Sequence, residues 1–195
     1  MDQASELTFA DPGPRYRRMT GVLALTYAAL QVVSRLLSAP LPDAVALAVD
    51  AAVVIVWLVV IQRLWRMTGG GTGASLLAAA FVTTAFGALV GILPLALRAF
   101  GDVPPAFYVV GMWVPLIAMI LGPILLGLGL LVGRLTPTWV AVLAMCWGLL
   151  KTLPLAALAL PPYLSALPAL TFAVVLGITL MVRLDDKRPD AQQCV

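Results

Sequence analysis

The chain has no histidine, only two cysteines and very few charged side chains. Without histidine it lacks the usual general base, the usual proton carrier and the commonest metal ligand. This absence excludes a serine–histidine triad and a histidine-bound metal, and two cysteines are too few for a thiolate metal cluster. Cys146 lies in an apolar segment and Cys194 in a polar tail. We therefore expect no metal site and no bound cofactor.

The shortage of charge identifies the class of protein. Charged residues make up 11% of the 195 residues and hydrophobic residues 62%, and the mean hydropathy is +1.04. Soluble domains have about 25% charged and about 45–50% apolar residues. This chain has too few charged side chains to cover the surface of a water-soluble protein. The formal net charge of +3 is modest, and no basic stripe with interleaved aromatic residues indicates nucleic acid as a partner. The composition predicts a protein whose partner is the lipid bilayer.

Six apolar segments are long enough to cross a bilayer, which takes roughly 20 apolar residues. Proline and glycine turns separate them, and the weakest break is Pro161–Pro162. We predict an all-α fold, a polytopic bundle of six transmembrane helices at residues 19–37, 44–64, 74–97, 106–132, 139–160 and 164–182. The predicted organisation is a polar N-terminal tail at 1–18, a six-helix transmembrane domain at 19–183 and a polar C-terminal tail at 184–195.

The basic residues predict how the helices are oriented in the membrane. If the N-terminus is inside, nine of the twelve basic residues lie on the cytoplasmic side, namely Arg15, Arg17, Arg18, Arg63, Arg66, Arg134, Arg183, Lys187 and Arg188. The positive-inside rule then places both termini in the cytoplasm and the protein in the cytoplasmic membrane as a multi-pass protein. The segments do not pair by proline position or by charge, which argues against an inverted-repeat transporter.

Ionisable residues inside the predicted spans are the first functional candidates, because each costs about 2.5–3.5 kcal/mol on insertion scales. At 1.5 Å rise per residue, Asp50 and Lys151 lie roughly 9 and 13 Å from the outer ends of their helices. Arg35 and Arg98 lie near the outer ends of two other helices. Asp50 paired with Lys151 or Arg35 would be purely structural. Alternatively, the four residues line a pocket whose spare positive charge suits an anionic or polar head group.

Polar and aromatic residues share helix faces with these charges. On the first helix the polar residues recur at spacings of three and four, which places them on one side. Trp57 follows Asp50 by seven residues, and Trp147 precedes Lys151 by four. Ordinary packing also explains the aromatic residues, and both interpretations stay open. The ligand-pocket candidates are Tyr27, Gln31, Arg35, Trp57, Arg98, Trp113, Trp147 and Lys151.

The stretch from Gly127 to Trp139 reads GLGLLVGRLTPTW and joins two predicted helices. A glycine-and-leucine helix exit followed by arginine, proline and tryptophan resembles a pattern in small actinobacterial membrane proteins of unknown function. The richness in alanine, leucine and valine, with few lysines, is also similar to proteins of high-GC actinobacteria. Because no activity is known for those proteins, the resemblance transfers no functional residue.

Three functions fit these features. We favour a non-enzymatic accessory or small-amphiphile-binding protein with a charged pocket in the outer half of the bilayer. The second is a membrane-embedded enzyme in which Asp50, protonated through burial, is the catalytic acid for an isoprenoid-like alkene or epoxide. A carbocation would then be stabilised by the rings of Tyr27, Trp57, Trp113 and Trp147. In size and residue types this is similar to the small integral-membrane terpene cyclases. The third is a proton-coupled small transporter using Asp50, in which two copies associate as a homo-oligomer.

Overall fold

The computed structural model describes residues 13–37, 43–98, 105–150 and 162–182, and these residues are helical apart from two short turns. The six helices are α1 (Gly13–Leu37), α2 (Asp43–Met67), α3 (Gly71–Arg98), α4 (Pro105–Val132), α5 (Thr138–Leu150) and α6 (Pro162–Val182). The prediction of an all-α fold with six helices is confirmed. The second half of the fifth predicted segment, which includes Lys151, lies outside the described residues.

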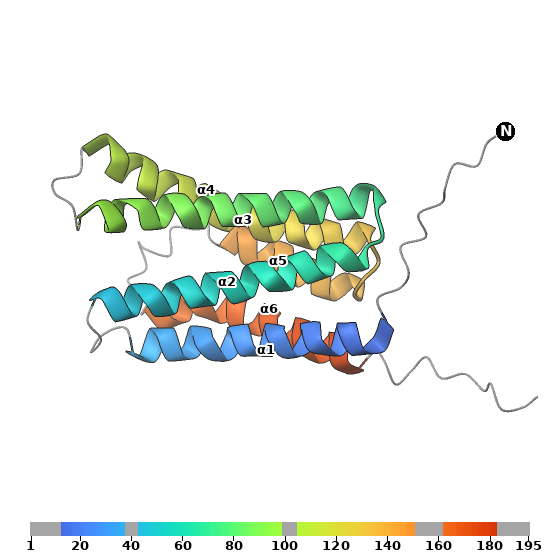
Figure 1. Ribbon diagram of the computed structural model, residues 1–195. Helices are drawn as coiled ribbons and strands as arrows, with labels where there is room; N and C mark the ends of the chain where they lie inside the picture. Colours follow the sequence, from blue (N-terminus) through green and yellow to red (C-terminus); the bar gives the residue numbers. More distant parts are fainter. Residues whose placement is uncertain (1–12, 38–42, 99–104, 151–161, 183–195) are drawn as a thin grey trace, which may run out of the picture.

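The six helices form a closed ring in which successive helices run antiparallel (Figure 1). Each helix packs against the next one in the chain, and α6 packs against α1 to complete the ring. Because six is an even number, the start of α1 and the end of α6 lie at the same end of the ring (Figure 1). We call this the packed end, because the core described below fills it. We call the opposite end the open end.

Helix α1 begins at Gly13, six residues before the predicted start of the first span at residue 19. Pro14 is tolerated in a first turn, where its missing N–H would have no partner anyway. Arg63 of α2 then holds this turn. Its Nε donates to Thr20 Oγ1 at 3.0 Å, a terminal nitrogen donates to the Tyr16 carbonyl at 3.2 Å, and its Cζ lies 3.8 Å from the Tyr16 ring centroid. These contacts between α1 and α2 extend the helix into residues that the hydropathy pattern assigns to the tail.

The core fills the packed end of the ring and stops near its middle. Its fully buried side chains include Ile61, Leu77, Leu126 and Leu176, which all lie toward the packed end of their helices. Glycine lets α1 and α6 approach closely there, because a Cβ on Gly21 would lie 2.7 Å from the carbonyl oxygen of Gly177. No similar packing fills the other half of the ring among the described residues, and the cavity described below is found there.

The outward faces carry large apolar side chains, among them Leu36, Ile55, Val82 and Leu89. By length and composition, four helical stretches can cross a membrane: Gly13–Leu36, Leu47–Met67, Gly71–Leu93 and Val109–Val132. The apolar stretches in α5 and α6 are shorter, at Thr138–Leu150 and Ala166–Val182. The described residues therefore have the features of an integral membrane protein with four candidate spans.

Candidate functional site

A cavity of about 450 Å³ lies inside the ring, in the half away from the packed end, and all six helices contribute to its lining. Small residues create this space. Gly87, Ala88 and Gly91 line it on α3, and Ala166 and Ala169 line it on α6. Each occupies a position where a leucine or phenylalanine would reach into the ring. Because protein interiors contain few voids larger than a water molecule, an internal space of this size is a candidate binding site.

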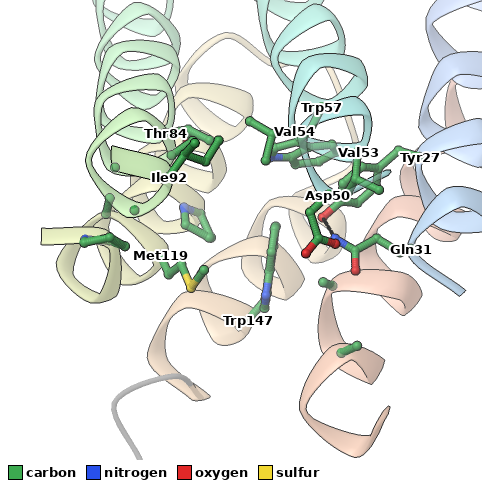
Figure 2. Close-up of a pocket in the computed structure, with 18 of the residues that line it drawn as sticks. Tyr27, Gln31, Asp50, Val53, Val54, Trp57, Thr84, Ile92, Met119 and Trp147 are labelled. Atoms are coloured by element: carbon green, nitrogen blue, oxygen red, sulfur yellow. Dashed lines mark hydrogen bonds between the residues drawn. The ribbon is translucent and has the colours of Figure 1, made fainter. Parts of the chain in front are cut away.

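Most polar groups of the cavity lie on α1 and α2, and Thr84 of α3 adds a hydroxyl. Figure 2 shows Tyr27, Gln31 and Asp50 together on one side, facing Ile92 and Met119 on the other. Gln31 Nε2 donates a hydrogen bond to the Tyr27 hydroxyl at 3.2 Å. The remaining lining residues are mainly aliphatic, aromatic or glycine. The cavity therefore has its charged and amide groups on α1 and α2, and a mainly apolar wall with one threonine on α3 and α4.

Asp50 is tied to α1 through a short hydrogen bond. The Ser34 hydroxyl, which is buried, donates to Asp50 Oδ1 at 2.6 Å. Arg35 directly follows Ser34 in α1 and lines the same cavity as Asp50. The Asp50 side chain itself is exposed. This carboxylate therefore lies on the cavity with one neutral hydrogen-bond donor beside it.

Arg35 and Asp50 line the same cavity, toward the open end of the ring. Arg35 is two residues before the end of α1, and Asp50 is seven residues after the start of α2. Because the Ser34 hydroxyl contacts Asp50 Oδ1 and a helix rises 1.5 Å per residue, the backbone of Arg35 lies close to the level of Asp50. Arg35 is also exposed. One basic and one acidic side chain therefore line the same part of the cavity.

Four aromatic rings separate the cavity from the core, and we call them the aromatic floor: Tyr27, Trp57, Trp147 and Phe172. Trp57 stacks on Tyr27 with centroids 4.5 Å apart and meets Trp147 edge-on at 5.8 Å. Trp147 in turn stacks on Phe172 at 5.8 Å. The Nε1 atom of Trp147 is covered and has no hydrogen-bond partner in the described part of the chain. Ring carbons of this residue, not its N–H group, therefore face the cavity.

The structure brings six of the nine predicted site residues to one cavity: Tyr27, Gln31, Arg35, Asp50, Trp57 and Trp147. Trp113 does not line it and is 52% exposed, because Gly111 and Pro115 on either side face inward and a helix turns by about 100° per residue. Lys151 lies outside the described residues, as does the side chain of Arg98.

The small and apolar residues that line the cavity cannot be predicted from the sequence. Gly87 and Gly91 recur at four-residue spacing, which is the available signal, but this spacing equally indicates close helix packing. Gly87 has both roles, close helix packing and lining of the cavity. A Cβ there would collide with the side chain of Ala118 on α4, and the residue also lines the cavity. Only the assembled ring distinguishes a wall position from a packing position.

Comparisons with protein-family models, curated proteins and solved structures find no significant match to this chain. No group of three histidine, cysteine or acidic residues in the described ranges lies close enough together to hold a metal ion. The cavity and its side chains are therefore the basis for the functional argument.

Proposed function

We propose that this is an integral membrane protein of six spans that binds a small amphiphilic molecule in the cavity, without catalysing a reaction. The observation that carries the proposal is the division of the lining, with charged and amide groups on α1 and α2 and mainly apolar groups on α3 and α4. A volume of about 450 Å³ lies within the range of about 300–1,000 Å³ that is typical of small-molecule sites. A neutral apolar molecule would leave unused the hydrogen-bonding capacity that Gln31 and Asp50 retain beyond their bonds to Tyr27 and Ser34.

The six-span arrangement is supported by the ring itself. Helices α5 and α6 complete it by packing against α4 and α1 and against each other. A helix in lipid satisfies its own backbone hydrogen bonds, which makes two further spans compatible with the apolar sequences of α5 and α6. On this proposal the ring is enclosed by lipid.

The distribution of charge supports an orientation with both termini in the cytoplasm. The packed end carries six arginines among the described residues, namely Arg15, Arg17, Arg18, Arg63, Arg66 and Arg134. The two acidic residues in the described ranges, Asp43 and Asp50, lie in the open half. Basic residues remain preferentially on the cytoplasmic side. The cavity would then lie in the outer half of the bilayer.

The other two functions considered from the sequence receive less support. Acid-initiated catalysis requires burial to keep Asp50 protonated, whereas this side chain is exposed and accepts a hydrogen bond from Ser34. A transporter requires a route across the membrane, whereas the aromatic floor and the core below it fill the ring. A binding site closed at one end fits both observations.

Quenching of tryptophan fluorescence by brominated amphiphiles tests the proposal. Trp57 and Trp147 line the cavity, while the other three tryptophans, Trp65, Trp113 and Trp139, are exposed and can be replaced by phenylalanine. The purified protein is titrated with 10-bromodecyl compounds that end in an alcohol, a carboxylate or a trimethylammonium group. We expect saturable quenching by at least one of the three.

A matched pair of variants locates the binding. Ala88→Phe fills the cavity from α3, whereas Leu89→Phe adds the same ring at a neighbouring position that is 68% exposed on the outer face. The first should weaken saturable quenching at least tenfold, and the second should leave it within twofold. Ala166→Leu on α6 blocks the opposite wall as an independent check. If all three probes quench only linearly with concentration, and equally in Ala88→Phe, the cavity is not a binding site.

A further inference from the structure

We infer that the bound molecule is a long-chain membrane lipid whose hydrocarbon chain leaves the cavity sideways, between α2 and α3, and continues into the bilayer. This inference rests on the proposed function, and it names the class of the ligand and its source. Two observations carry it, namely the separation of α2 from α3 in the open half of the ring and the apolar side chains found there.

The neighbouring helix pairs are held together at the level of the cavity. Glycine brings α3 against α4, because a Cβ on Gly91 would lie 3.1 Å from the side chain of Pro115. Helix α1 is joined to α2 by the hydrogen bond of 2.6 Å from Ser34 to Asp50. These contacts close the wall of the ring between α1 and α2 and between α3 and α4.

Helices α2 and α3 are arranged differently. A short turn at residues 68–70 joins them at the packed end, and from there they separate toward the open end (Figure 1). Helix α3 also packs much more extensively against α4 than against α2. Both α2 and α3 contribute lining residues in the open half. The cavity therefore lies between these two helices there, in the place of direct helix packing.

The side chains where α2 and α3 separate are apolar. Val54 on α2 faces α3, which carries Ile92 (Figure 2), and these two residues and Ala88 line the cavity and are half-buried. We call the space between these three residues the lateral opening. The next residues along the two helices, Ile55 and Leu89, are exposed on the outer faces. The lining thus continues within one residue to the apolar surface that lipid would cover.

An opening with apolar sides suits a hydrocarbon chain. A polar head group would lose its hydration there without gaining hydrogen bonds, whereas a chain finds apolar surroundings in the cavity, in the opening and in the bilayer. The head group would lie with Gln31 and Asp50, which supply the polar groups of the cavity. The lining therefore divides the ligand into a head inside the ring and a chain that extends out of it.

The relative depths of these residues match the orientation of a lipid in the bilayer. Val54 is four residues after Asp50 on α2, so the lateral opening lies about 6 Å further from the open end. In the proposed orientation the open end faces the outer surface. The head group would then lie nearer this surface and the chain nearer the bilayer centre, as in a lipid of the outer leaflet. Such a lipid can enter without turning over.

Chain length tests the inference, because a lateral opening accepts a long chain and an enclosed cavity does not. The alcohol, carboxylate and trimethylammonium probes are each made with a decyl and an octadecyl chain that carries bromine at carbon 10. They are compared at equal mole fraction in dodecyl maltoside micelles, with Trp57 and Trp147 as the only tryptophans of the protein. For each head group that quenches saturably, the octadecyl probe should bind within threefold of the decyl probe, since its added carbons stay in apolar surroundings.

A reversible clamp locates the chain. In a background without cysteine, Val54→Cys and Ala88→Cys are joined by a bis-methanethiosulfonate reagent, which bridges the lateral opening. The cross-link should lower the affinity for the octadecyl probe at least fivefold more than the affinity for the decyl probe, and a reductant should reverse the effect. The matched control joins Thr83→Cys to Val114→Cys, in a shallow groove on the outer face of α3 and α4. This second clamp should leave the ratio of the two affinities within twofold.

The outcomes distinguish this inference from the proposed function. Octadecyl probes that bind more than threefold more weakly than their decyl counterparts would show an enclosed site, which overturns the inference and leaves the amphiphile site in place. A clamp across the lateral opening that weakens both chain lengths equally, or neither, overturns it as well. If no probe of either length quenches saturably, the proposed function is contradicted, and the inference is contradicted with it.

Discussion

Trp57 on α2 stacks against Tyr27 on α1, with ring centroids 4.5 Å apart and an interplanar angle of 30°. This pair lies where the core of the packed end gives way to the cavity, and both rings are almost fully buried. Edge contacts of Trp57 with Trp147 and Phe172 extend the pair to α5 and α6. The same rings therefore hold four helices together and form the base of the proposed binding site.

The aromatic floor should contribute strongly to stability. Phe172 is fully buried, and Phe172→Ala removes a ring that contacts two tryptophans. We expect a loss of about 3–5 kcal/mol in the free energy of unfolding, as is usual for large aromatic truncations in a core. Phe86→Ala is the matched control, because Phe86 is 57% exposed on the outer face. Unfolding in mixed micelles of increasing SDS content measures both variants, and equal losses would contradict the prediction.

The contacts of Arg63 should hold the start of α1 to α2. Arg63→Met keeps the length of the side chain but removes its hydrogen bonds to Thr20 and to the Tyr16 carbonyl. We expect a loss of about 1–3 kcal/mol in unfolding free energy, since both part-buried acceptors lose a charged donor and keep only the Thr20–Tyr16 hydrogen bond within α1. Arg66→Met, at an exposed position one turn later, should change stability by less than about 0.5 kcal/mol. A larger effect at Arg66 would show that net charge, not the contact, is responsible.

Ser34 and Asp50 should be energetically coupled. A double-mutant cycle with Ser34→Ala and Asp50→Ala isolates the interaction across α1 and α2, because each change removes one partner of the hydrogen bond. We expect a coupling of about 0.5–3 kcal/mol, the range for residues in direct contact. The same cycle with Lys151→Met measures the ion pair that the sequence suggests. A coupling between Asp50 and Lys151 larger than that between Asp50 and Ser34 would contradict the assignment of Ser34 as the main partner.

The proposed orientation can be measured with cysteine labelling. In a Cys146→Ser background, Cys194 is the only cysteine left. A membrane-impermeant maleimide should label it in inverted membrane vesicles and not in intact cells. A cysteine introduced at Ser38, between α1 and α2, should show the opposite pattern. Labelling of Cys194 from outside the cell would reverse the orientation and place the cavity in the inner half of the bilayer.

The helices and several site residues can be predicted from the sequence because their signals are local. Apolar length defines each helix, and the cost of a charge within an apolar segment singles out Asp50. The start of α1 cannot be predicted from hydropathy, because its first turns are rich in arginine and are held by Arg63 of α2. Hydropathy averages over neighbours in the chain, so it cannot register a contact between residues 43 positions apart.

What the sequence alone determined is that this chain is all-helical, apolar enough for a membrane, and without histidine or a cysteine cluster for metal or triad chemistry. The tertiary structure decided which residues share a space. Trp113 and Trp147 are the same residue type on apolar helices, yet Trp113 faces outward and Trp147 faces the cavity. The cavity itself exists because small residues from several helices meet at one level of the ring. That coincidence depends on how helices are rotated and shifted against each other, and packing between distant segments sets both.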